Sequence, residues 1–237
     1  RLDAAYSVNP EFWAAVLPSV REKYPDVWIF GEVIHGDYAS IVRASGMDSV
    51  TQYELWKGIW SSIESRNFFE LDHALGRHNE FSDAFTPMTF VGNHDVTRIA
   101  SRVGQDGAVL ATAILATIGG IPLIYYGDEL AYRGVKEERF GGDDDIRPVF
   151  PASPADLSNL GADTLRAHQN LLGLRRRHPW LVDARTESLD LTNERYVYRT
   201  GVPGVEPLIV ELDVRDGCSV LIREAGQVIW SSGASPL

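Results

Sequence analysis

Apolar residues fall into short continuous runs and longer periodic stretches that alternate through most of the chain. The short runs are predicted strands, at residues 27–30, 48–53, 88–91 and 120–126. The longer stretches place apolar side chains on one face of a helix, and they cover residues 10–24, 38–44, 54–66, 69–81, 96–102, 108–118 and 162–177. Alternation of strand and helix is typical of an α/β protein with a parallel sheet.

The pattern changes after Trp180. Short β-type runs, separated by turn residues such as Asp216-Gly217 and Ala225-Gly226, replace the helical periodicity. These runs lie at residues 195–199, 208–210, 220–222 and 228–230. We therefore predict two domains, an α/β part over residues 1–180 and a small all-β domain over residues 181–237.

The α/β part contains five strand–helix units if the segment at Arg1 is included as a strand. A closed barrel of parallel strands needs eight such units. The prediction is therefore a TIM (β/α)8-type barrel from its fourth strand onward, present as its last five units. The missing N-terminal barrel segment is expected to precede Arg1 and to be a necessary partner.

Three of the predicted strands end in an acidic residue, namely Asp3, Glu32 and Asp95. The carboxyl ends of barrel strands meet at one face, where catalytic residues gather. Two facing carboxyl groups can cleave a glycosidic bond, and a third can stabilise the positive charge that develops on the sugar. Acids at strand ends are also common simply because strand ends are solvated, so position alone leaves both interpretations open.

Neighbouring residues indicate how these acids would differ. Arg1 and Asp3 are two positions apart on a strand and point the same way, so Arg1 would keep Asp3 ionised, as a nucleophile requires. Glu32 follows an apolar strand, and partial desolvation would suit it to the role of general acid. Asn93 and His94 can donate hydrogen bonds to sugar hydroxyls, whereas His35 either lines the same cleft or caps a loop.

The composition of the chain argues against two classes of binding partner. The chain of 237 residues has a formal net charge of -11, which argues against binding to nucleic acid or to an anionic membrane. Residues 108–126 carry no charge, but Gly119-Gly120 and Pro122 interrupt them, so a buried helix followed by a strand is predicted instead of a membrane span. A single cysteine, Cys218, excludes an intramolecular disulfide and slightly favours a cytoplasmic location.

A metal site is not indicated by the histidines or the acids. The six histidines have no helical pair with a third ligand nearby. Residues 143–145 are three aspartates, yet they lack the alternating ligands of a calcium loop. We expect no required cofactor and no metal ligand, with Ca²⁺ as the alternative left open.

Four blocks of residues occur in an order that resembles a known family. Arg1-Leu2-Asp3-Ala4-Ala5, Gly31-Glu32-Val33 and Phe90-Val91-Gly92-Asn93-His94-Asp95 are similar to the second, third and fourth signatures of the α-amylase family, glycoside hydrolase family 13. Residues 120–129 resemble the segment at that family's last barrel strand. The resemblance covers residues 1–179, and the β-rich tail suits the family's C-terminal domain.

The resemblance implies a role for each acid. Asp3 would be the nucleophile that forms a covalent glycosyl-enzyme, Glu32 the general acid/base, and Asp95 the transition-state stabiliser. Arg1 and His94 would hold the nucleophile and the sugar in the first subsite. The implied reaction is retaining hydrolysis of an α-glucosidic bond, or transfer of the glucosyl group.

Two departures from the family pattern shape the expected substrate. The family's first signature lies outside this chain, and the second signature continues as Tyr6-Ser7 where many α-amylases have Lys-His. The second departure, Tyr6-Ser7, disfavours a typical calcium site and binding of long starch chains. We therefore expect small α-glucosides or short α-glucans as substrates.

Two alternatives remain at this point. One is a transglycosylase or sugar isomerase that uses the same residues. The other, of a different class, is a non-catalytic carbohydrate-binding fragment. Intact acids at all three positions argue against a degenerate site, although residues 1–237 alone are expected to be inactive without the missing barrel segment.

Overall fold

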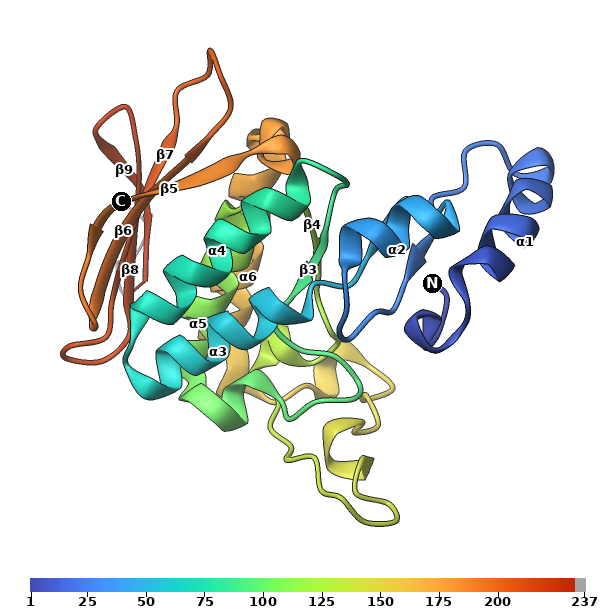
Figure 1. Ribbon diagram of the computed structural model, residues 1–237. Helices are drawn as coiled ribbons and strands as arrows, with labels where there is room; N and C mark the ends of the chain where they lie inside the picture. The colour runs from blue at the N-terminus through green and yellow to red at the C-terminus, as the bar shows by residue number, and fades with distance from the viewer. Residues whose placement is uncertain (233–237) are drawn as a thin grey trace.

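The computed structural model of the protein describes residues 1–232. Its parallel strands follow one another in space in the order of the chain (Figure 1). β1 (Phe30–Gly31) pairs with β2 (Ser49–Val50), and β3 (Met88–Phe90) pairs with β4 (Ile121–Leu123). Isolated parallel bridges, Leu2 to Gly31 and Thr51 to Met88, extend the ladder at its start and join the two pairs. The predicted parallel α/β arrangement is confirmed.

The strands are shorter than the apolar runs predict, and side chains explain two of the differences. The backbone N–H of Ile29 donates to the carboxylate of Asp48 at 2.6 Å, its carbonyl accepts from the Asp48 N–H at 2.8 Å, and the regular strand pairing begins at Phe30. The side chain of Gln52 accepts from the N–H groups of Glu54 and Leu55, which starts a helix where residues 52–53 were predicted to continue a strand.

Within residues 1–232, six α-helices connect and cover these strands. They are α1 (Pro10–Lys23), α2 (Tyr38–Ser45), α3 (Tyr53–Ser65), α4 (Phe68–Ser82), α5 (Ile99–Thr117) and α6 (Ala162–Arg177). Short 3₁₀ turns lie at Ala5–Ser7, Asp128–Leu130, Asp144–Ile146, Pro154–Asp156, Asn159–Gly161 and Pro179–Asp183. The N-caps of α1 and α2 are as their sequences suggest, since the side chains of Asn9 and Asp37 accept from the backbone N–H groups of Glu11 and Ser40.

The predicted helices agree with these bounds to within a few residues. Residues 96–102 and 108–118 were predicted as two helices, and the structure has two helical stretches in this region, which share the label α5. The predicted interruption between them lies at Gly104, whose φ of 74° and ψ of 178° are not helical. No helix in residues 1–232 is long and apolar enough to cross a membrane. The uncharged run at 108–126 contains the second half of α5 and then β4, as predicted.

A five-stranded antiparallel sheet forms the C-terminal part of the chain. Its strands, in spatial order, are β5 (Arg185–Leu191), β6 (Arg195–Gly201), β7 (Leu208–Asp213), β8 (Ser219–Glu224) and β9 (Gln227–Ser231). The sequence-based prediction missed β5. This edge strand is mostly polar, and only Thr186 in it is buried, so no apolar run marks it.

The sheet does not have a core of its own. Its inward side chains, including Tyr196, Tyr198 and Val210, belong to the same apolar cluster as α3, α4, α5 and α6. A second, smaller cluster lies under α1 and α2, at the opposite end of the molecule from the sheet (Figure 1). The division into domains 1–180 and 181–237 stays a prediction, and this shared core offers a way to test it.

Candidate active site

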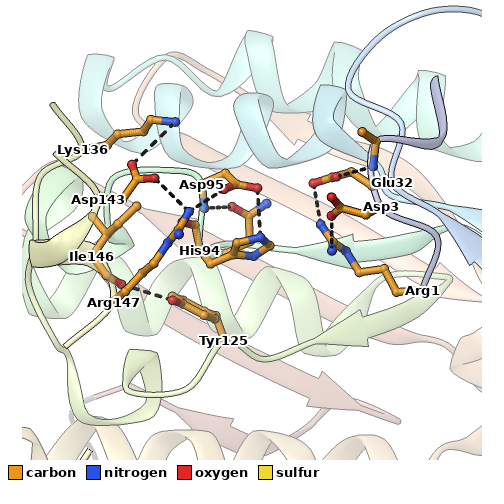
Figure 2. A network of polar contacts seen from close by, with 12 residues as sticks. Arg1, Asp3, Glu32, His94, Asp95, Tyr125, Lys136, Asp143, Ile146 and Arg147 are labelled. Atoms are coloured by element: carbon orange, nitrogen blue, oxygen red, sulfur yellow. Dashed lines mark hydrogen bonds and ion pairs between the residues drawn. The ribbon is translucent and has the colours of Figure 1, made fainter. Parts of the chain in front are cut away.

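The three predicted acids follow strand segments at their carboxyl ends. Asp3 comes directly after the bridge residue Leu2, Glu32 directly after β1, and Asp95 shortly after β3. Because the ladder is parallel throughout, these ends lie on the same side of the sheet. Figure 2 shows the acids within one group of polar side chains.

Arg1 contacts two of the acids. One guanidinium nitrogen, Nη1, lies 2.6 Å from Asp3 Oδ1, and Nη2 lies 2.8 Å from Glu32 Oε1. Burial lowers the pKa of Arg1, but the carboxylates of Glu32 and Asp3 raise it more, so the net shift is upward. The contact with Asp3 was predicted from strand geometry. The contact with Glu32 was not, because it joins residues that are far apart in the sequence.

Glu32 and Asp3 occupy opposite environments. The side chain of Glu32 is only 8% exposed, whereas that of Asp3 is 77% exposed. The backbone N–H of Ala4 donates to Glu32 Oε2 at 3.0 Å, and the hydroxyl of Tyr53 donates to Oε1 at 3.4 Å. The predicted desolvation of Glu32 is therefore present.

Tyr53, at the start of α3, links Glu32 to the segment after β3. Asn93 Nδ2 donates to the Tyr53 hydroxyl at 2.8 Å, and Asn93 Oδ1 accepts from the backbone N–H of Asp95 at 2.8 Å. Burial raises the pKa of Tyr53, so its hydroxyl stays protonated and able to donate. Asn93 thus uses both ends of its amide within the protein, and its predicted contact with a sugar stays a prediction.

Asp95 is held by a histidine and by an arginine that the sequence analysis missed. His94 Nε2 lies 3.2 Å from Asp95 Oδ2, and Arg147 Nη2 lies 2.9 Å from Asp95 Oδ1. Arg147 belongs to the long charged loop after β4, more than fifty residues away in the chain. No local pattern distinguishes it from the other charged residues of that loop.

His35 stands apart from this network. Its exposed ring lies 5.3 Å from the ring of Tyr6, centroid to centroid. The backbone N–H of Tyr6 in turn donates to the carbonyl of Glu32 at 3.3 Å, which places the pair near the acids. Its role as a sugar-binding residue stays a prediction.

The aspartates at 143–145 do not form a cation site in the described part of the chain. Within residues 1–232, no group of three or more His, Cys, Asp or Glu side chains is placed to hold a metal ion. Asp143 instead lies 2.9 Å from Arg147 and 3.9 Å from Lys136 (Figure 2). The expectations about Ca²⁺ and other cofactors stay predictions.

A parallel α/β-barrel ladder with a cluster of carboxyl groups at its strand ends defines a class of protein, and sequence comparison specifies the family. Residues 6–186 match the family described as "Alpha amylase, catalytic domain". The chain therefore belongs to the α-amylase family, as the four blocks of residues predicted. Glu32 and Asp95 lie inside the matched region, while Arg1 and Asp3 precede it.

Relatives in other organisms carry hydrolase and transferase names. The maltogenic alpha-amylase of Bacillus acidopullulyticus is 31% identical over 193 residues, which are 77% of this chain and 31% of that protein. The 4-alpha-glucanotransferase of Thermotoga maritima is 40% identical over 134 residues, which are 55% of this chain and 29% of that protein. The chain thus spans about a third of the length of these relatives.

Solved structures of the same family share the fold. A structure of AmyP in complex with maltose has a TM-score of 0.76 at 18% identity, and covers 90% of this chain and 53% of that one. The cyclic alpha-maltosyl-(1→6)-maltose hydrolase of Arthrobacter globiformis, in complex with maltose, has a TM-score of 0.76 at 22% identity, with coverages of 92% and 49%. These matches support the predicted fold, a TIM-type barrel followed by a β-rich C-terminal part.

Proposed function

We propose that the protein is a retaining glycoside hydrolase that cleaves α-glucosidic bonds of small α-glucosides or short α-glucans. The observation that carries this proposal is the arrangement of Arg1 between exposed Asp3 and buried Glu32. The positive charge of Arg1 reduces the repulsion between the carboxyl groups of Asp3 and Glu32, so both can lie close to the same glycosidic bond.

The proposed reaction has two steps. In the first, Glu32 gives its proton to the glycosidic oxygen while a carboxylate oxygen of Asp3 attacks the anomeric carbon, and the bond to the leaving sugar breaks. In the second, Glu32 takes a proton from water, the water oxygen attacks the same carbon, and Asp3 is released. The exposure of Asp3 suits a nucleophile that a sugar must reach, and the contacts of Glu32 with Arg1 and with the Ala4 N–H hold it on the same guanidinium group as that nucleophile.

Asp95 would stabilise the oxocarbenium-like charge of both transition states. His94 Nε2 lies 3.2 Å from one oxygen of its carboxylate and Arg147 Nη2 lies 2.9 Å from the other, so both oxygens are held in place. Sugar binding is supported by two solved structures of the same fold, each of which is a complex with maltose.

A second candidate is glucosyl transfer by the same residues. Matches to two 4-alpha-glucanotransferases support it, one 40% identical over 134 residues and the other 29% identical over 131 residues. Hydrolase and transferase would share the covalent intermediate on Asp3 and differ in whether water or a sugar hydroxyl attacks it. Product analysis at high maltose concentration separates them, because glucosyl transfer forms one maltotriose for each glucose released, whereas hydrolysis releases two glucose molecules and forms no longer oligosaccharide.

The test of the proposed function compares wild-type protein with Glu32→Gln and Asp3→Asn, in the full-length protein that contains this chain. We expect release of p-nitrophenol from an α-linked p-nitrophenyl glucoside to fall by about 10²–10⁴-fold in each variant. Glu54→Gln, which changes an exposed glutamate paired with Arg77, serves as the matched control and should retain activity. Full activity in Glu32→Gln or Asp3→Asn would contradict the assigned roles, and binding of maltose without any turnover in the wild type would favour a binding protein.

A further inference from the structure

The loop between β4 and α6 returns to the acids that follow the other strands. Residue 147 of this loop reaches two consecutive residues after β3 (Figure 2). Arg147 Nε donates to the carbonyl oxygen of His94 at 2.8 Å, and Nη2 donates to Asp95 Oδ1 at 2.9 Å. A planar guanidinium that bonds both a main-chain oxygen and a carboxylate fixes the position and the rotation of that carboxylate.

Arg147 is itself held from behind. Its Nη2 also lies 2.9 Å from Asp143 Oδ2, and Lys136 Nζ lies 3.9 Å from Asp143 Oδ1. The charges alternate in sign along a row of four side chains, Lys136, Asp143, Arg147 and Asp95. Arg147 therefore pairs with Asp143 on one side and with Asp95 on the other. Each side chain in this row lies next to one of opposite charge, so the contacts between neighbours are attractive.

The backbone next to Arg147 is anchored in the interior. Ile146 is completely buried, and its carbonyl oxygen accepts from Arg98 Nε at 3.0 Å and from the Tyr125 hydroxyl at 3.2 Å. Arg98 is also completely buried, and it donates to the carbonyl of Tyr126 at 2.6 Å and to Asp128 Oδ1 at 2.9 Å. The start of the Arg147 side chain is therefore placed by a rigid support, as a precise functional contact requires.

The side chain of Arg147, by contrast, is 42% exposed and is not part of the core. Its removal would leave no cavity among buried residues and no buried charge without a partner. A role in stabilising the fold therefore explains little of this arrangement, whereas a role at Asp95 explains all of its contacts.

We propose that Arg147 is a positioning residue for Asp95, an inference that rests on the proposed glycosidase function. Arg147 occupies Oδ1 of Asp95 and holds this carboxylate in one rotamer. Oδ2, next to His94, is then the oxygen that faces the sugar. Because the stabilising effect of Asp95 is needed in the transition state, loss of Arg147 lowers kcat more than it weakens substrate binding.

The experiment measures kcat and KM for an α-glucoside with wild-type protein, Arg147→Ala and Arg147→Lys, all in the full-length protein. We expect kcat to fall by about 10–100-fold in Arg147→Ala with KM within about threefold of wild type. Arg147→Lys, which keeps the charge but loses the planar two-point contact, should recover part of the lost kcat. Added guanidinium ion, below concentrations that unfold the protein, should raise the kcat of Arg147→Ala.

Arg139→Ala is the matched control, because Arg139 lies in the same loop, is exposed, and pairs only locally with Glu137 in the described part of the chain. Its kcat should stay within about twofold of wild type. A wild-type kcat in Arg147→Ala, or a rise in KM with unchanged kcat, would overturn the inference while leaving the proposed function intact. Absence of turnover in the wild type itself would overturn the proposed function and this inference together.

Discussion

The hydroxyl of Tyr53 connects the buried acid Glu32 to Asn93, which in turn holds the backbone of Asp95. A chain of hydrogen bonds thus joins two acids that come from different strands. The strand-end argument predicts both acids, because it depends only on the position of each acid in its own segment. It cannot predict Tyr53, since nothing in the local sequence shows that the first residue of α3 reaches across to two other segments.

Tyr53→Phe tests this connection at the level of one atom. The change removes the hydroxyl and leaves Asn93 Nδ2 and Glu32 each without one partner, so kcat should fall by about tenfold, equivalent to about 1.4 kcal/mol. Tyr24→Phe, on an exposed tyrosine, is the control and should be neutral. Measurement of kcat and of thermal stability for both variants checks the prediction, and an unchanged kcat in Tyr53→Phe would show that the link is dispensable.

His78 on α4 predicts a pH dependence of stability. Burial lowers the pKa of His78 to about 4, and its Nε2 lies 3.1 Å from the carbonyl oxygen of Gly119, with Arg185 and Arg175 adding to the downward shift. Between the ordinary pKa of histidine and about 4, the unfolded chain binds a proton that the folded protein does not. The stabilising contribution of neutral His78 is therefore present at pH 7 and lost as the pH falls toward 4.

The check is urea unfolding of wild type and His78→Gln at several pH values between 7 and 4.5. The difference in unfolding free energy between the two proteins should shrink as the pH falls, by at most about 3 kcal/mol. A difference that stays constant or grows with acidification would contradict the assignment of a buried neutral histidine.

At the scale of elements, the helices follow the sequence more closely than the strands do. Helical bounds depend on periodicity and caps within one segment, as in α6, which begins and ends where the pattern predicts. Strand bounds depend on the partner, and at Ile29 the backbone N–H bonds the Asp48 carboxylate instead of a main-chain oxygen, so the apolar run begins before the paired strand. The polar edge strand β5 was missed for the same reason, because its pairing with β6 defines it.

Substitution by alanine is expected to have opposite effects on stability at two glycines, Gly104 at the break in α5 and Gly76 within α4. Gly104 has a φ of 74° and a ψ of 178°, a region that only glycine adopts without strain, so Gly104→Ala should destabilise the protein by about 1–3 kcal/mol. Gly76 lies on an exposed position of α4 with nothing within 4 Å of an added Cβ, so Gly76→Ala should stabilise by roughly 0.5–1 kcal/mol. Denaturant unfolding measures both, and a stabilising Gly104→Ala would mean that α5 runs unbroken in solution.

At the scale of the whole molecule, the C-terminal sheet and the helices share one apolar core. Tyr198 of β6 is completely buried, and its hydroxyl lies 2.7 Å from the hydroxyl oxygen of Thr117 at the end of α5. Leu212 of β7 is equally buried in the same cluster. A sheet without a separate core is expected to unfold together with the helices that cover it.

Leu212→Ala tests this cooperativity. Removal of the buried side chain should cost about 2–5 kcal/mol and should shift the unfolding transition seen by helical circular dichroism as much as that seen by hydrogen exchange of the backbone amides of β6, β7 and β8. Leu189→Ala, on an exposed residue of β5, is the control and should shift neither transition appreciably. Two separate transitions, of which only one moves in Leu212→Ala, would instead support residues 181–237 as an independent domain.

The amino-acid sequence by itself determined the alternation of strands and helices, the helix bounds, the β-rich tail and the strand-end positions of Asp3, Glu32 and Asp95. These features depend on short-range periodicity, caps and runs, which a local pattern records. Only the tertiary structure decided that Arg1 is shared by two acids, that Tyr53 joins Glu32 to Asn93, and that Arg147 reaches Asp95. Such contacts join residues that are distant in the chain, and their geometry depends on how the segments between them pack.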